Sequence, residues 1–153
     1  MIIDYYKTDV VVVDAVLGKG IEAGAYDQAA GWTYRGLISV SRQYGLDGEA
    51  YDLGKMGMNV AFNQLETYLS DGPVIASIHY KFNPKSRVPH LVVITGIKNG
   101  MVYYNDPAAK IGGKQISVAD FEKGWKKRFI VLRPTKISGP VALTGWHPHT
   151  SRL

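Results

Sequence analysis

The apolar residues in the first part of the chain recur at helical spacing. Residues 1–7, "MIIDYYK", have apolar side chains at intervals that suit a buried helix face, and no capping residue precedes them. A second short helix is expected with Thr8 or Asp9 as its N-cap, running through residues 10–17 and closed by the glycines that follow. Its four consecutive valines would suit a strand equally well.

Two further helices are predicted before residue 72. Thr33 can cap a helix in "GWTYRGLISVSRQYGL", where apolar residues follow helical spacing until Gly45 ends it. A short extended piece follows over residues 49–54. Asn59 is then expected to cap a helix over residues 60–72.

From Gly72 onward the pattern changes from helix to sheet. Four runs are rich in β-branched and aromatic residues and are bounded by turn formers: residues 73–80, 90–98, 101–106 and 129–134. Asn99-Gly100 predicts a hairpin that makes the second and third runs antiparallel neighbours. Ser117 is expected to cap a short helix over residues 118–125, between the third and fourth runs.

Helices followed by an antiparallel sheet define an α+β fold class. The chain has 153 residues, of which 46% are hydrophobic and 20% are charged, which fits one folded domain. We expect that domain over residues 1–134. Residues 135–153 lose periodicity and are interpreted as a loosely attached C-terminal tail.

Charge and cysteine content narrow the functional classes. The formal net charge is +5, but the basic residues are dispersed except in residues 123–128, "KGWKKR", which we interpret as a solvated rim in preference to an anion site. No nucleic-acid partner is therefore expected. The chain has no cysteine, which removes disulfides, thiolate metal sites and any cysteine nucleophile within it. No apolar run reaches the ~18 residues of a membrane span, and no targeting signal in the sequence indicates a cellular compartment.

A histidine and an aspartate are placed to meet at one end of the expected sheet. His90 opens one strand, and Asp106 ends the next strand across the hairpin turn. The expected register pairs residue 93 with residue 106, which leaves Asp106 about three residues short of His90, a gap that a bulge or a twist can close. An imidazole held by a carboxylate is the base and orienting acid of hydrolytic triads.

A structural interpretation of the same residues stays open. A histidine before a buried strand is often a half-exposed polar residue, and the Asn-Asp-Pro sequence is a common turn. His79 is interpreted as a solvent-facing strand residue. His147 and His149 form an H-x-H pair in the tail, where a metal site would lack further ligands, so no metal and no cofactor are expected.

Six segments in order carry a resemblance to a known family: "MIIDYY", "AYDQAAGWTYRGLISVSRQYGL", "LETYLSDGPVIASIHY", "HLVVITGI", "VYYNDP" and "ISVADFEKGWKKRFIVLRP". Together they resemble the papain-like cysteine peptidases, most specifically the bacteriocin-processing (double-glycine leader) peptidase family. The resemblance covers about residues 1–134. It implies the papain-like cysteine proteinase fold, with His90 as the triad base and Asp106 as its orienting acid.

The resemblance also implies a missing part. In the family, a nucleophilic cysteine opens the first helix, and a glutamine a few residues earlier helps to form the oxyanion hole. This sequence has positions for neither, and its first predicted helix has no start signal. We therefore expect an N-terminally shortened copy of a cysteine-peptidase-like domain, whose first helix is truncated.

Two main functions from different classes remain, and a third is considered beside them. The family implies hydrolysis of peptide or related amide bonds through a thioester, which this chain is not expected to perform without a cysteine. The alternative is a non-catalytic peptide-binding or regulatory papain-like module; a weaker possibility is recognition of an anionic cell-surface polymer by residues 123–128. In each main case the expected partner is a peptide or protein, and many family members are secreted or attached to the cell surface.

Overall fold

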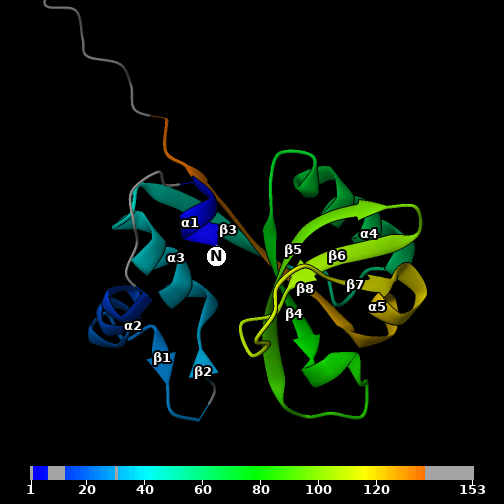
Figure 1. Ribbon diagram of the computed structural model, residues 1–153, viewed down its shortest axis with the longest axis horizontal. Helices are drawn as coiled ribbons and strands as arrows, with labels where there is room; N and C mark the ends of the chain where they lie inside the picture. Colours follow the sequence, from blue (N-terminus) through cyan, green and yellow to red (C-terminus); the bar gives the residue numbers. More distant parts are fainter. Residues whose placement is uncertain (1, 7–12, 30, 137–153) are drawn as a thin grey trace, which may run out of the picture.

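The computed structural model describes residues 2–6, 13–29 and 31–136, and the described chain begins with a helical region (Figure 1). Its elements in order are α1 (Ile2–Tyr6), α2 (Val13–Glu22), β1 (Tyr26–Asp27), β2 (Gly31–Trp32) and α3 (Tyr34–Arg42). The two short strands pair antiparallel with each other. The helix expected at the start of the chain is therefore present as α1.

The glycines that were expected to close the second helix lie inside it. α2 continues through Gly18 and Gly20 to Glu22, and Gly24 follows with a φ of 68°. Gly20 is needed for close packing, because an added Cβ there would lie 2.4 Å from the Trp32 ring. The prediction of the helix end is thus wrong, and the predicted caps at residues 8 and 9 lie outside the described residues.

Side-chain caps predicted for two helices are confirmed. The Thr33 hydroxyl accepts a hydrogen bond from the Gly36 amide, 3.1 Å away, and α3 follows it. The Ser117 hydroxyl accepts from the Asp120 amide at 3.1 Å and begins α5 (Val118–Gly124). Each bond satisfies a backbone amide that the first turn of a helix leaves unpaired.

The cap expected at Asn59 is wrong. Helix α4 (Met58–Leu69) begins two residues earlier than predicted, and its N-cap is Gly57, which has an extended backbone conformation and no side-chain cap. The Gly57 carbonyl accepts the Ala61 amide, so the helical hydrogen bonds begin there. Asn59 therefore lies within the first turn.

Six strands form one antiparallel sheet in the order β3-β8-β4-β5-β6-β7. The strands are β3 (Leu46–Asp52), β4 (Val74–His79), β5 (Pro89–Lys98), β6 (Met101–Asn105), β7 (Lys114–Ser117) and β8 (Trp125–Pro134). A short 3-10 turn, η1 (Tyr80–Phe82), follows β4. The sequence did not predict β7 or η1, and β8 is longer than expected; the α+β class is confirmed.

The Asn99-Gly100 hairpin is confirmed, but its ladder contains an irregularity. Lys98 pairs with Met101 and Gly96 with Tyr103, as the turn predicts. The register shifts between Ile94 and Gly96, so Val93 pairs with Asn105 and not with residue 106. Because side chains alternate between the two faces, this one-residue shift at a β-bulge changes which residues of β5 lie on the same face as a given residue of β6.

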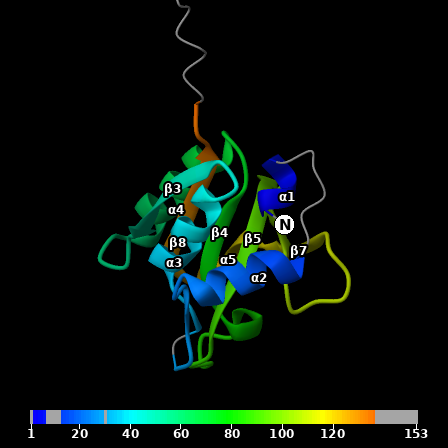
Figure 2. The ribbon, with the colours of Figure 1, turned by 90° about the vertical axis from the view of Figure 1, so that its left-hand side faces the viewer.

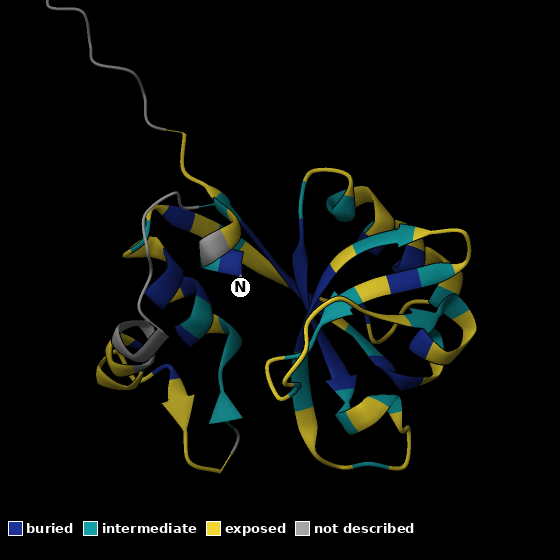
Figure 3. Ribbon diagram, viewed as in Figure 1, coloured by how far each residue is buried: buried dark blue, intermediate teal, exposed yellow. Residues whose placement is uncertain are grey.

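Helices cover both faces of the sheet, and each interface contains a hydrophobic core (Figures 1 and 2). On one face, α1 and α3 pack on Ile75, Ile130 and Leu132. On the other, α4 and α5 enclose the larger core, whose fully buried members include Phe121 and Phe129. Figure 3 shows buried residues concentrated along the central strands, while the connecting loops are mostly exposed.

The predicted boundary between domain and tail falls at the end of the last strand. β8 ends at Pro134, and the Thr135 amide still donates a hydrogen bond to the Gly45 carbonyl. Residues 137–153, with His147 and His149, lie outside the described residues. The division at residue 134 stays a prediction.

Candidate functional site

The two residues singled out by the sequence are joined by a short hydrogen bond. Nε2 of His90 lies 2.7 Å from Oδ1 of Asp106. The side chains are 14% and 16% exposed, so protein atoms shield most of the contact from water. A carboxylate can only accept a hydrogen bond, so this contact holds the proton on Nε2 and leaves Nδ1 as the second ring nitrogen.

The bulge in the β5–β6 ladder brings these side chains to one face of the sheet. Without it, Asp106 would stand opposite Val93, whose side chain points away from the His90 face. The shift makes Val93 pair with Asn105, so continuing the ladder places Asp106 opposite Val92. Val92 and His90 are two residues apart on the same strand and therefore share a face, which makes Asp106 a diagonal neighbour of His90.

A tight turn after β6 fixes the direction of the carboxylate. Oδ1 of Asp106 also accepts the Ala108 amide at 2.8 Å, and the Asp106 carbonyl accepts the Ala109 amide at 3.0 Å. This is the turn geometry that the Asn-Asp-Pro sequence suggested. The turn and the contact with His90 coexist, since one carboxylate oxygen can accept more than one donor.

An aromatic ring holds the imidazole from another direction. The Tyr80 ring meets the His90 ring edge to face, with centroids 5.2 Å apart. Tyr80 begins η1, in which Lys81 and Phe82 both have a φ of 55°, an uncommon conformation for residues with a side chain. Such backbone geometry persists where the surrounding structure fixes it.

Packing of Phe82 fixes η1. Its ring contacts Tyr104 and Phe121, with centroid separations of 5.1 and 5.9 Å. Gly124 lies so close that an added Cβ would stand 2.5 Å from the Phe82 Cα. The core contacts of Phe82 therefore hold η1 in place, and η1 holds the Tyr80 ring against His90.

The negative charge of Asp106 affects the pKa of the neighbouring Tyr104 side chain. Burial, and secondly the negative charge of Asp106, raise the pKa of Tyr104. Tyr104 consequently stays neutral well into the alkaline range.

Nδ1 of His90 makes no hydrogen bond to any residue that the structure describes, so this nitrogen can accept a proton from a reactant.

His79 does not join this pair. The prediction of a solvent-facing His79 is wrong, because this ring is half-buried where the chain after β4 turns back over it. Nδ1 of His79 donates to the Ser86 carbonyl over 2.8 Å. Within residues 2–6, 13–29 and 31–136, no group of three potential metal ligands is found.

Internal contacts occupy most of the basic residues at 123–128. Lys123 lies 3.3 Å from Asp120, and Arg128 lies 2.9 Å from Asp52. The Lys127 ammonium donates to two backbone carbonyls in the loop before α4, those of residues 54 and 56. Lys127 and Arg128 thus connect β8 to residues 52–56, and the exposed ion pairs agree with the interpretation as a solvated rim.

Sequence reasoning did not identify Tyr80 or the basic loop that follows it as parts of the site. No periodicity marks Tyr80, because its ring reaches His90 through an irregular turn. One signal was available for the loop: residues 72–105 contain no aspartate or glutamate, although they include Lys81, Lys85 and Arg87.

Comparisons with known proteins agree with this architecture. The model of the Peptidase_C39 like family matches residues 2–129. Of the helices in the described residues, none is long and apolar enough to cross a membrane. No curated protein matches the sequence.

Solved structures of peptidases share the fold. One is a double glycine motif protease from an AMS/PCAT transporter in complex with the leader peptide: 23% identity, TM-score 0.61, covering 88% of this chain and 79% of that one. Another is the peptidase domain of Streptococcus ComA, a bifunctional ABC transporter: 17% identity, TM-score 0.62, covering 86% and 84%. A C39-like peptidase from Bacillus anthracis has 20% identity and a TM-score of 0.51, with coverage of 69% and 62%.

These structures confirm the predicted papain-like fold, and the family match extends over most of the chain. The chain belongs to the Peptidase_C39-like family.

Proposed function

We propose that His90 and Asp106 are the base and the orienting acid of a cysteine-peptidase-type site. The observation that carries the proposal is the 2.7 Å contact between Nε2 and Oδ1, which leaves Nδ1 free of partners among the described residues. A neutral imidazole with its proton on Nε2 presents a lone pair at Nδ1 and can take a proton from a thiol. Asp106 stabilises the imidazolium that forms.

The reaction would follow the course of amide hydrolysis by a thiolate. The thiolate attacks the amide carbon, and His90 returns the proton to the leaving amine as the thioester forms. Water then hydrolyses the thioester, with His90 again acting as base. This chain has no cysteine, so we expect no thiol-dependent hydrolysis from the 153 residues alone.

The proposed substrate class is a peptide. One relative of similar fold is a double glycine motif protease solved in complex with the leader peptide. We infer that the same type of ligand, an extended peptide carrying a pair of glycines, is the first to test here.

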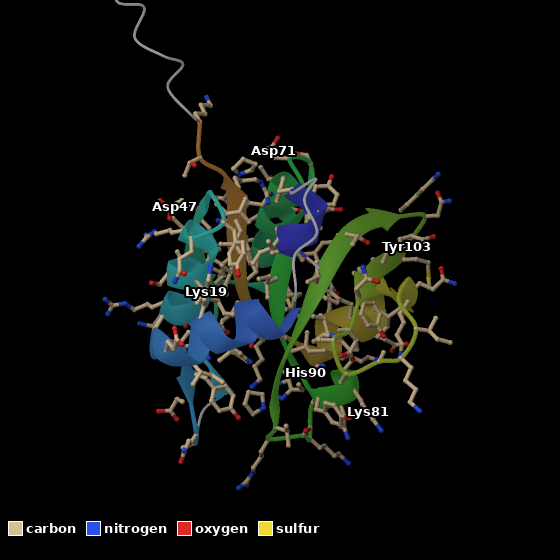
Figure 4. All side chains as sticks on the ribbon, turned by 60° about the vertical axis from the view of Figure 1, so that its left-hand side comes forward. Lys19, Asp47, Asp71, Lys81, His90 and Tyr103 are labelled. Carbon is tan, nitrogen blue, oxygen red and sulfur yellow. The ribbon has the colours of Figure 1, made fainter. Side chains whose placement is uncertain are left out.

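The experiment adds a thiol to the site. The N-terminal cysteine-containing segment of a related peptidase is fused before Met1, and hydrolysis of a Gly-Gly peptide is measured. We expect activity that is lost in His90→Ala and is about 10²–10⁴-fold lower in Asp106→Asn, as for general bases and their orienting groups. Asp71→Asn is the matched control: Asp71 is exposed and lies at the opposite end of the molecule from His90 (Figure 4). Activity that survives His90→Ala would refute the proposal.

A non-catalytic peptide-binding module is the second candidate, and the absence of cysteine favours it for the chain as given. Peptide binding by the unmodified chain, unaffected by His90→Ala and without activity after fusion of the cysteine segment, would identify such a module. Activity that depends on His90 would identify the peptidase.

A further inference from the structure

The loop that leads into His90 carries an unbalanced positive charge. Residues 80–88, which we name the cationic loop, connect β4 to β5 and include Lys81, Lys85 and Arg87, all exposed. No carboxylate of the described residues forms an ion pair with them. Because residues 72–105 contain no aspartate or glutamate, no acid in this stretch of the chain offsets the charge.

The backbone of the cationic loop is held in one shape. The Asn83 side chain accepts the Lys85 amide at 3.0 Å, and the Asn83 carbonyl accepts the Ser86 amide at 2.9 Å. The Ser86 carbonyl in turn accepts from the His79 ring, and the Tyr80 amide donates to the Val88 carbonyl. These bonds fix where the three cationic side chains leave the backbone, so a ligand meets them with little further ordering of the chain.

Two ring contacts connect the cationic loop to the proposed site. The Lys81 ammonium lies over the Tyr80 ring, 5.5 Å from its centroid, and the Tyr80 ring meets the His90 ring. Figure 4 shows Lys81 and His90 at the same end of the molecule. Among the described residues, the carboxylate hydrogen-bonded to His90 is that of Asp106, which also accepts the Ala108 amide.

We propose that the cationic loop binds acidic residues of the peptide whose amide bond lies at His90. This inference rests on the proposed function and names its substrate class: a peptide with aspartates or glutamates next to the bond. Charges of opposite sign attract the ligand during its approach and set its position once bound.

The distribution of other basic groups favours a peptide over a long polyanion. A nucleic acid or an anionic polysaccharide is bound by a basic stripe that follows the polymer. Here the cluster is confined to one turn, and the second basic run, residues 123–128, is largely engaged with carboxylates and carbonyls of its own chain. A short acidic segment fits the cationic loop better.

The test uses the full 153-residue chain and two labelled peptides. One carries three glutamates beside a Gly-Gly pair, and its partner has glutamines in their place; binding is followed by fluorescence anisotropy. The triple variant Lys81→Gln/Lys85→Gln/Arg87→Gln removes the charge, and Lys55→Gln/Lys98→Gln/Lys136→Gln is the matched control. The control residues are exposed lysines outside the cationic loop, so both variants lose the same net charge.

We expect the acidic peptide to bind about tenfold more tightly than the glutamine peptide at low salt, a preference that the triple variant loses and the control keeps. Circular dichroism of both variants confirms that they are folded. Equal binding of the two peptides by the unmodified chain would overturn this inference and leave the proposed function standing. Absence of binding of both peptides would also overturn this inference, while the proposed function is decided separately by the fusion experiment. A sulfated polysaccharide that binds through the same three residues as tightly as the acidic peptide would overturn the assignment to a peptide.

Discussion

Gly124→Ala tests whether core packing supports the site. The glycine ends α5 beside η1, and an added Cβ would lie 2.5 Å from the Cα and 2.6 Å from the carbonyl oxygen of Phe82. Both contacts involve backbone atoms, so no side-chain rotation can relieve them. Overpacking of this kind costs about 1–3 kcal/mol, while replacing a helical glycine with alanine gains about 0.5–1 kcal/mol, which leaves a net loss of about 1 kcal/mol at the middle of both ranges and of about 2.5 kcal/mol at most.

Urea unfolding measures this loss as a lower midpoint at an unchanged m-value. Gly18→Ala is the matched control: Gly18 also lies in a helix, but its added Cβ would have no described atom within 4 Å apart from its chain neighbours and its own helix backbone, so we expect a gain of about 0.5–1 kcal/mol. The ring signals of Tyr80 and His90 in NMR spectra should shift only in Gly124→Ala. A Gly124→Ala protein as stable as the original, with unshifted ring signals, would refute the close packing of η1 on α5.

Three further predictions concern the site and the sheet. A double-mutant cycle of His90→Ala and Asp106→Ala should give a coupling of about 1–2 kcal/mol in the free energy of unfolding, because their bond is largely shielded from water; additive effects would contradict it. Tyr80→Ala should cost about 0.5–1.5 kcal/mol by urea unfolding, and Tyr80→Leu, which keeps apolar bulk without the ring, should recover only part of it. Hydrogen bonding with Tyr68, burial, and then the Glu49 carboxylate raise the pKa of Tyr51, so its contribution to stability is complete below the ordinary tyrosine pKa of about 10 and is lost as pH rises through the raised value. Stability should therefore fall less steeply above about pH 10 in Tyr51→Phe than in the original chain, and equal slopes would argue against the shift.

Local chemistry made part of the fold predictable. Thr33 and Ser117 cap helices because their hydroxyls accept first-turn amides, and Asn99-Gly100 forms the expected hairpin. These signals act over two to four residues, and distant packing does not override them. The hairpin also placed His90 and Asp106 at one end of the sheet, as the structure has them, and their catalytic role stays a prediction.

Features that depend on tertiary contacts were not predictable. α2 passes through Gly20 because the Trp32 ring needs the room there, which the local sequence does not reveal. β7 has only four residues and takes its place by pairing with β6. The bulge near Gly96 puts Asp106 on the same face of the sheet as His90. A strand pattern does not locate such an irregularity before the partner strand is known.

The protonated ring nitrogen of His90 tests the central claim most directly. Heteronuclear NMR of histidine-labelled protein, at a pH where the imidazole is neutral, distinguishes the two tautomers. The bond from Nε2 to Asp106 predicts the proton on Nε2 and a free lone pair on Nδ1, a preference that should weaken in Asp106→Ala and persist in Asp71→Ala. A proton found on Nδ1 would contradict the account, because the nitrogen proposed to act as the base would have no lone pair to offer.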